Sequence, residues 1–173
     1  MPEFLSPNQI LSQLDLKSTM VAADFGCGSG GWVIPLAKIL EDGRVWAVDI
    51  QEEALSALES KLQLYRISNV KKVVADIERG VSQISSSSLD LVLMSNLLFQ
   101  VEDKKAVFEE AERVLKRGGK VLVVDWVKNA PFGPKEGVVS PEEVKEIAQN
   151  VGFRFEKEIP AGGYHYALLF VKV

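Results

Sequence analysis

The sequence contains a single cysteine, Cys27, and a single histidine, His165, among 173 residues. One cysteine excludes an intramolecular disulfide framework and fits a reducing, cytoplasmic setting. A chain of this length buries a sufficient core without metal or disulfide help, so we expect no metal centre. No apolar run approaches the roughly 20 residues that span a bilayer, and the first residues lack the basic region of a signal peptide, which argues against membrane insertion and secretion.

Positive charge is also scarce. Lysine and arginine sum to 20 against 24 aspartates and glutamates, which gives a net charge of −4, and no basic run reaches four residues. Wholesale binding to nucleic acid or to an anionic membrane is therefore disfavoured. The length and the 47% hydrophobic content predict a single domain, in which residues 1–20 form a helical extension and residues 21–173 form the core.

Short β-branched runs alternate with longer amphipathic segments along the chain, a pattern typical of an α/β fold with a parallel sheet between helices. The first five runs are nearly continuous apolar stretches, as expected for strands buried on both faces. Only residues 160–163 separate the last two runs, which is too short for a crossover helix, so these two strands must pair antiparallel. The strands are predicted at residues 21–25, 44–49, 71–75, 89–95, 120–126, 153–159 and 164–171.

The gaps between the strands hold the predicted helices. Ser140, followed by a proline and two glutamates, is a good helix start, and Gly152 closes the same helix. Gly118 and Gly119 are predicted to end the preceding helix. Pro35 lacks the N–H required inside a helix, so it should distort or delay the first turn of its own segment. The helices are predicted at residues 32–40, 52–64, 104–115 and 141–150.

Two regions are predicted to lie in solvent. Residues 128–139, with two prolines and two glycines, form a long loop after the fifth strand, and such loops are often functional lids. The acidic cluster Glu109, Glu110 and Glu112 is interpreted as a solvated helix face.

A glycine-rich turn between the first strand and the first helix is the most informative segment. Glycines let the backbone turn tightly and approach a ligand closely. Gly26, Gly28 and Gly31 satisfy the dinucleotide spacing G-x-G-x-x-G, whereas Gly26, Gly28 and Gly30 satisfy the G-x-G-x-G spacing of S-adenosylmethionine sites. The glycines alone do not decide between these two cofactors.

Three aspartates, each close to the end of one of the first three strands, help to decide. Asp24 would repel the pyrophosphate of a dinucleotide but attracts the ammonium group of S-adenosylmethionine. Asp49 suits the ribose hydroxyls of either cofactor. Asp76 lies where a carboxylate accepts a hydrogen bond from an adenine amino group.

From residue 21 to residue 173 the chain resembles a class I S-adenosylmethionine-dependent methyltransferase. The resemblance rests on Ala23-Asp24-Phe25-Gly26-Cys27-Gly28-Ser29-Gly30, Val45-Trp46-Ala47-Val48-Asp49, Ala75-Asp76-Ile77, Ser88-Leu89-Asp90-Leu91-Val92-Leu93-Met94-Ser95-Asn96, and the run from Ala111 through Gly118-Gly119 to Leu122. It implies a Rossmann-like, doubly wound, seven-stranded mixed sheet of order 3-2-1-4-5-7-6, with S-adenosylhomocysteine as the product of the cofactor. The implied cofactor-binding residues are Asp24, Gly26, Cys27, Gly28, Gly30, Asp49, Ile50, Asp76, Ile77 and Asn96.

The chain also departs from some branches of the family. Leu97-Leu98-Phe99-Gln100 stands where relatives often carry histidine after the fourth strand, and no Asn-Pro-Pro-Tyr or Asp-Pro-Pro-Tyr motif follows that strand. With Cys27 alone, arsenic methylation and cysteine-based RNA methylation are not expected. The matching motifs resemble a subgroup that includes many small-molecule methyltransferases, among them quinone-biosynthesis types.

No residue is assigned as catalytic, and the candidates are His165, Tyr164 and Tyr166. The beginning of an antiparallel last strand lies at the edge of the sheet where ligands bind in open α/β folds. Strand alternation puts His165 on the face opposite the two tyrosines, and we favour His165 for chemistry. Cys27 is interpreted as a small residue against the cofactor, and Trp32 as either a cofactor neighbour or simple packing.

The sequence therefore predicts an enzyme that transfers a methyl group from S-adenosylmethionine to a small-molecule acceptor. Two alternatives stay open: an NAD(P)-dependent oxidoreductase and a non-catalytic S-adenosylmethionine-binding module. A homo-oligomer is compatible with the sequence, and nucleic acid is not an expected partner.

Overall fold

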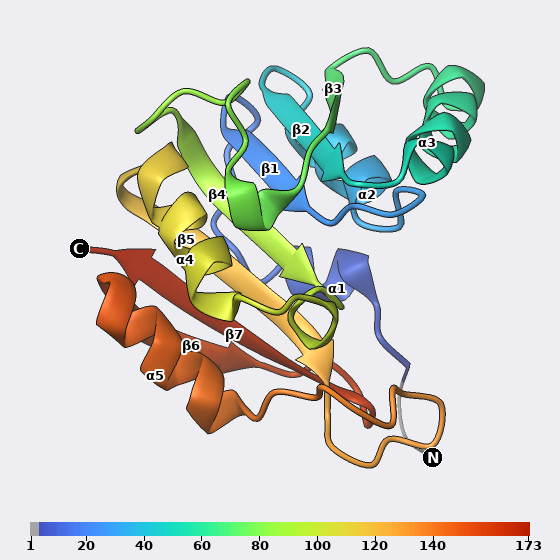
Figure 1. The fold of residues 1–173 in the computed structure, drawn as a ribbon. Coiled ribbons are helices and arrows are strands. Elements are labelled where there is room, and N and C mark those ends of the chain that lie inside the picture. Colours follow the sequence, from blue (N-terminus) through green and yellow to red (C-terminus); the bar gives the residue numbers. More distant parts are fainter. Residues whose placement is uncertain (1–3) are drawn as a thin grey trace.

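The computed structural model describes residues 4–173 as one seven-stranded sheet between helices (Figure 1). The strand order is β3-β2-β1-β4-β5-β7-β6, as predicted. The strands are β1 (Val21–Phe25), β2 (Arg44–Asp49), β3 (Val70–Val74), β4 (Leu89–Ser95), β5 (Leu115–Trp126), β6 (Phe153–Ile159) and β7 (His165–Lys172).

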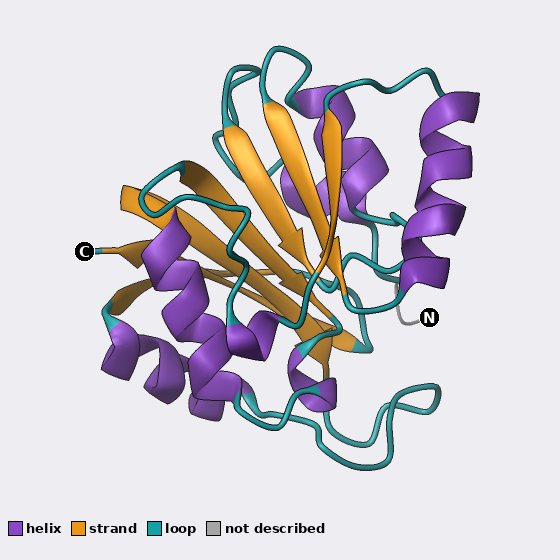
Figure 2. Ribbon diagram, turned by 45° about the horizontal axis from the view of Figure 1, so that its top comes forward, coloured by secondary structure: helices purple, strands orange, loops and turns teal. Residues whose placement is uncertain are grey.

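Helices cover both faces of the sheet (Figure 2). Side chains of α4, α5 and η1 pack into one core, and those of α1, α2 and α3 into the other. No helix within the described residues is long and apolar enough to cross a lipid bilayer. The α-helices are α1 (Pro7–Leu11), α2 (Val33–Ile39), α3 (Glu52–Leu64), α4 (Lys104–Val114) and α5 (Pro141–Val151), and the 3₁₀ turns are η1 (Ile77–Arg79) and η2 (Leu98–Gln100).

The first five strands are parallel, and β7 lies antiparallel between β5 and β6. All carboxyl ends of the parallel strands therefore meet at one edge of the sheet. The chain leaves β1 toward β2 and leaves β4 toward β5, so the connections diverge between β1 and β4. Open α/β sheets form their ligand-binding crevice at this point.

Most predicted bounds agree with the structure within one residue, but the start of β5 was predicted wrongly. Helix α4 ends at Val114, and β5 already begins at Leu115. Leu89 pairs with Leu115 and Leu91 with Lys120, so residues 116–119 bulge out of the ladder. Gly118, at φ 81°, supplies the left-handed backbone of this bulge rather than a helix end.

The other predicted helix starts and ends agree with the structure within one residue. The Ser140 hydroxyl accepts a hydrogen bond from the Glu143 N–H at 3.2 Å, and Gly152 ends α5 at φ 115°. Pro35 is the third residue of α2, where an N–H has no intrahelical partner, so it delays the helix by one residue without breaking it. Of the predicted extension over residues 1–20, α1 is helical, and residues 1–3 lie outside the described part.

Replacing Ser140 by alanine should lower the free energy of unfolding by about 1 kcal/mol, because the N-terminus of α5 loses its cap. Urea denaturation measures this change. Ser56→Ala, at an exposed position inside α3, is the control and should leave stability unchanged or slightly higher. Equal stability of Ser140→Ala and the wild-type protein would contradict the role of the cap.

Candidate functional site

A cavity of about 590 Å³ opens at the carboxyl ends of β1 to β4. Nine of the ten predicted cofactor-binding residues line it: Asp24, Gly26, Cys27, Gly28, Asp49, Ile50, Asp76, Ile77 and Asn96. Gly30 is the exception, and Gly31 lines the cavity instead. A Cβ on Gly30 would lie 2.5 Å from the Leu58 side chain, so this glycine lets the loop pack on α3.

The glycine loop is tied to the end of β2. The N–H groups of Gly26 and Cys27 both donate to the Val48 carbonyl, at 2.8 and 2.9 Å. Gly26 has φ 73°, and a Cβ there would lie 2.8 Å from Leu97, so a side chain at this position would clash with the cavity wall. The loop thus brings bare backbone to the cavity surface.

Asp49 holds the second glycine of the loop. One of its carboxylate oxygens accepts from the Gly28 N–H at 2.8 Å and the other from the Gln51 N–H at 2.9 Å. Since each carboxylate oxygen has two acceptor positions, both oxygens retain capacity for ligand hydroxyls.

Asp24 is buried at the end of β1, with 1% of its surface exposed. Neither carboxylate oxygen has a hydrogen-bond partner among the described residues. Burial, together with the negative charge of Asp49, raises the pKa of Asp24 to about 8. A buried acid without a partner is costly, so this position calls for a cationic or hydrogen-bond-donating ligand.

Two further carboxylates line the cavity on the β3 side. Asp76 accepts from the Glu78 N–H at 3.0 Å, and Glu78 accepts from the Asp103 N–H at 2.6 Å. With Asp24 and Asp49, the described lining therefore carries four acidic side chains, and it includes neither lysine nor arginine. This electrostatic environment favours a cation and disfavours a pyrophosphate.

The end of β4 forms the opposite wall. Asn96 has a left-handed backbone at φ 51°, and its side-chain oxygen is buried without a partner among the described residues. The side-chain amide of Gln100 donates to the main-chain carbonyl of Asn96 at 2.6 Å. The Leu98 N–H donates to the Asp125 carboxylate at 3.0 Å. Burial raises the pKa of Asp125 to about 6. These contacts fix η2 against the sheet.

Cys27 is buried in the glycine loop, and its thiol donates to the Gly28 carbonyl at 3.4 Å. Burial, followed by the negative charges of Asp24 and Asp49, raises the pKa of the thiol. A thiol kept protonated is a poor nucleophile, so Cys27 acts as a small lining residue. Trp32, also in the lining, is 7% exposed.

The three candidate catalytic residues lie outside the cavity lining. Tyr166 is buried, and its hydroxyl donates to the Val139 carbonyl at 2.7 Å. His165 stacks on Trp126, its ladder partner on β5, with ring centroids 4.1 Å apart. Both ring nitrogens are buried without a partner among the described residues, and burial lowers the pKa of the imidazole. Tyr164 lies between the rings of two exposed phenylalanines, Phe4 and Phe132.

The long loop over residues 128–139 connects this aromatic region with the cavity wall. A Cβ on Gly137 would lie 2.5 Å from the Phe99 carbonyl, so the loop backbone rests directly on η2. Gln100 and Leu97, on and beside η2, line the cavity. Figure 1 shows the loop, in orange, beyond the tip of β5.

Residues 16–158 match the protein family described as a methyltransferase domain, and the chain belongs to this family. It is 28% identical over 127 residues to a demethylmenaquinone methyltransferase of Bacillus mycoides, covering 73% of this chain and 53% of that protein. It is 29% identical over 134 residues to phosphoethanolamine N-methyltransferase 1 of Triticum aestivum, covering 77% and 26%. The chain thus spans about half the length, or less, of these relatives.

A solved structure confirms the fold. A SAM-dependent methyltransferase from Aquifex aeolicus superposes with a TM-score of 0.89 at 24% sequence identity, covering 98% of this chain and 91% of that chain. The seven-stranded sheet with its antiparallel β7 is therefore the fold expected from the resemblance to class I methyltransferases.

Replacing Asp24 by asparagine should stabilise the protein at pH values above 3.8, the ordinary pKa of the aspartate side chain. The pKa of Asp24 is about 8 when folded against 3.8 ordinarily, so between these values the folded state binds more protons than the unfolded state. Wild-type stability therefore falls as pH rises through this window, and Asp24→Asn lacks this loss. The gain at pH 8 is on the order of a few kcal/mol, since each pKa unit corresponds to about 1.4 kcal/mol.

Urea denaturation at pH 5 and pH 8 measures the effect. Asp15→Asn, at an exposed position, controls for the change in net charge. If the difference in stability between the wild-type protein and Asp24→Asn is the same at both pH values, the environment assigned to Asp24 is wrong.

Proposed function

We propose that this chain binds S-adenosylmethionine and transfers its methyl group to a small-molecule acceptor. The observation that carries the proposal is the buried, unpartnered Asp24 carboxylate beside a glycine loop, in a cavity lined by four acidic side chains. A ligand with an ammonium and a sulfonium group supplies the missing positive charge. Family membership supports the same reading.

The alternative of a dinucleotide-dependent oxidoreductase is disfavoured by the same carboxylates. A pyrophosphate at the glycine loop would lie beside Asp24 and Asp49, and no basic side chain of the described lining would offset that repulsion. The alternative of a binding module without catalysis differs from an enzyme only in turnover.

Seven of the lining residues have a proposed role in holding the cofactor. Asp24 accepts from the methionine ammonium, Asp49 from the ribose hydroxyls and Asp76 from the adenine amino group. Ile50 and Ile77 offer apolar surface to the flat adenine ring. The bare backbone at Gly26 and Gly28 leaves room for close approach.

S-adenosylmethionine supplies an activated methyl group, so this chain mainly has to orient the acceptor and exclude water. A general base is needed only when the acceptor arrives protonated. His165 is the side chain we propose for that task, because both of its ring nitrogens lack a hydrogen-bond partner among the described residues. Its lowered pKa keeps the imidazole neutral, which is the form that accepts a proton.

The acceptor is proposed to be a small molecule. The two relatives are named for menaquinone precursors and phosphoethanolamine, both small acceptors. The net charge of −4 gives nucleic acid no electrostatic advantage. We assign the acceptor side of the site to the aromatic region around Tyr164 and Phe132 and to the 128–139 loop, because this loop rests on η2 beside the cavity.

Calorimetry should detect binding of S-adenosylhomocysteine and no binding of NAD. At pH 7 Asp24, with a pKa of about 8, is mostly protonated in the free protein. It ionises beside the ligand ammonium, so binding should release close to one proton. Titration in two buffers of different ionisation enthalpy measures this release, and Asp24→Asn should show none. NAD binding of comparable strength, or no binding of S-adenosylhomocysteine, would remove the proposal.

His165→Ala should lower methyl transfer at least about a hundredfold while leaving the affinity for S-adenosylhomocysteine unchanged, because general-base catalysis contributes about 10²–10⁴-fold. The assay follows labelled methyl from S-adenosylmethionine into host small-molecule, protein and RNA fractions. Leu169→Ala is the matched control: it removes buried volume from the same face of β7 and should lower stability without lowering turnover. Normal turnover by His165→Ala would assign His165 to packing alone, and incorporation confined to RNA would overturn the acceptor class.

A further inference from the structure

The crossover from β3 to β4 differs from the other crossovers between parallel strands. Each of the others contains an α-helix, whereas this one contains only η1 followed by the loop over residues 80–88. It nevertheless carries Asp76, Ile77 and Glu78, which line the cavity. No helical hydrogen-bond ladder fixes this wall, so its position has to come from other contacts.

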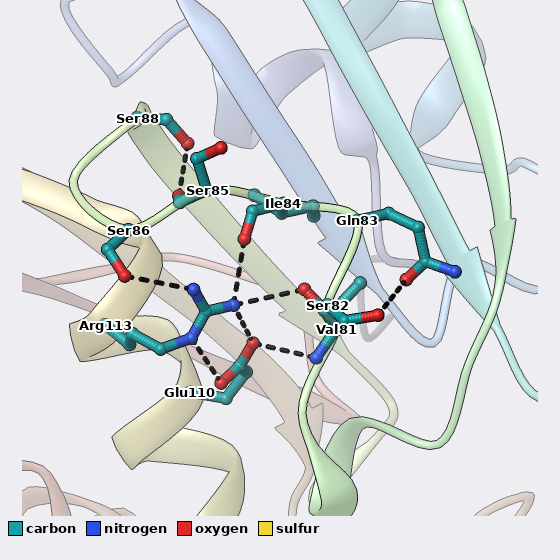
Figure 3. A network of polar contacts seen from close by, with 9 residues as sticks. All are labelled: Val81, Ser82, Gln83, Ile84, Ser85, Ser86, Ser88, Glu110 and Arg113. Atoms are coloured by element: carbon teal, nitrogen blue, oxygen red, sulfur yellow. Dashed lines mark hydrogen bonds and ion pairs between the residues drawn. The ribbon is translucent and has the colours of Figure 1, made fainter.

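One ion pair on α4 supplies several of those contacts (Figure 3). The Glu110 carboxylate accepts from the Val81 N–H at 2.8 Å and pairs with the Arg113 guanidinium. Arg113 in turn donates to the carbonyls of Val81 at 3.1 Å and Ile84 at 3.0 Å, and to the Ser86 hydroxyl at 3.1 Å. Two side chains thus satisfy four polar groups of the crossover.

Both ends of α4 reinforce this attachment. At its start, the Asp103 N–H donates to Glu78 at 2.6 Å. At its end, the N–H groups of Ser87 and Ser88 donate to the carbonyls of Arg113 and Val114, at 2.9 and 2.8 Å. The crossover is therefore held by hydrogen bonds to α4 from the start of this helix to its end.

The expectation that Glu110 lies on a solvated helix face is wrong, since it is 8% exposed. Burial by itself would raise the pKa of Glu110, but hydrogen bonds from Arg113 and the Val81 N–H and the charge of Arg113 outweigh it and lower the pKa. The pair stays ionised at neutral pH. Charge-assisted hydrogen bonds of this bidentate kind are strong and geometrically specific.

We infer that Glu110 and Arg113 are positioning residues for the adenine side of the cavity. By fixing Val81 and Ile84, they hold the short chain that leads back through left-handed Gly80, at φ 90°, to Ile77 and Asp76. Loss of the pair would free this wall while leaving the glycine loop and Asp24, on the other side of the cavity, in place. This inference rests on the proposed function, because it assigns this wall to the adenine of S-adenosylmethionine.

The test measures the dissociation constants of S-adenosylhomocysteine and 5′-methylthioadenosine by calorimetry, below the unfolding temperature of every variant. Glu110→Ala should weaken both ligands equally, by about tenfold, because both carry adenosine and linked sites typically couple by about 5- to 150-fold. Glu110→Gln keeps an oxygen that accepts from Val81 and should largely restore binding, to within about threefold of wild type.

Two controls separate positioning from simple loss of stability. Val144→Ala removes buried volume from α5 in the same core and should lower the melting temperature without weakening either ligand. Arg113→Lys keeps the positive charge but cannot form the planar set of contacts to Glu110, Val81 and Ile84, so it should weaken both ligands as Glu110→Ala does. If Glu110→Ala does not fold, Arg113→Lys provides the test in its place. Amide exchange of residues 76–88 should quicken in Arg113→Lys and stay unchanged in Val144→Ala.

The outcomes are distinct. Wild-type protein that binds neither compound refutes the proposed function and this inference with it. If the wild-type protein binds both compounds, and Glu110→Ala or Arg113→Lys binds them with wild-type affinity, this inference is overturned and the proposed function stands. Equal weakening by Val144→Ala also overturns it, because the effect would then follow stability and not the position of the wall.

Discussion

The Asp24 carboxylate is the constraint around which the rest of this site is arranged. It lies near the end of strand β1, between β2 and β4, with both oxygens buried and no described residue donating to them. A buried acid of this kind destabilises the folded state whenever it is ionised. The surrounding strands, which are almost fully apolar, offset that cost through burial. Function and stability therefore oppose each other at this one side chain, as is common where a site is built for a charged ligand.

The fold followed closely from the sequence because its strands are buried on both faces. Runs such as Leu89–Ser95 are recognisable by continuous apolar residues, and the short link over residues 160–163 allowed only an antiparallel hairpin. The start of β5 was missed for a local reason. Gly118 and Gly119 have the composition of a helix end, but pairing of Leu115 with Leu89 draws the chain into the sheet before the glycines, which then form a bulge. Sheet pairing across the molecule overrides a local signal of this kind.

The candidate site was predictable where local patterns mark the ends of β1, β2 and β3, and not where it depends on contacts between distant segments. Aspartates that follow buried strands, and glycines between a strand and a helix, are local patterns that carry the family resemblance, and nine of the ten residues implied by that resemblance line the cavity. Glu78 and Glu110 depend on contacts between segments distant in sequence, with Asp103 and Val81 respectively. One signal was available: Glu110 follows Val107 by three residues and precedes Val114 by four, which puts it on the buried stripe of α4. A glutamate on such a stripe, with an arginine three residues later, indicates a buried pair rather than a solvated face.

The two sides of the cavity are consequently held by different physical means. The glycine loop is fixed by backbone hydrogen bonds to β2 and belongs to the rigid sheet. The other two walls of the cavity, formed by η1 and η2, are connected through α4. This helix begins shortly after η2, and the N–H of its capping residue Asp103 donates to Glu78. Asp125 fixes η2 from β5, and the 128–139 loop rests on η2 in turn. The η1 wall, α4, η2 and the 128–139 loop therefore form one continuous series of contacts around the cavity, whereas the glycine loop is held separately by β2.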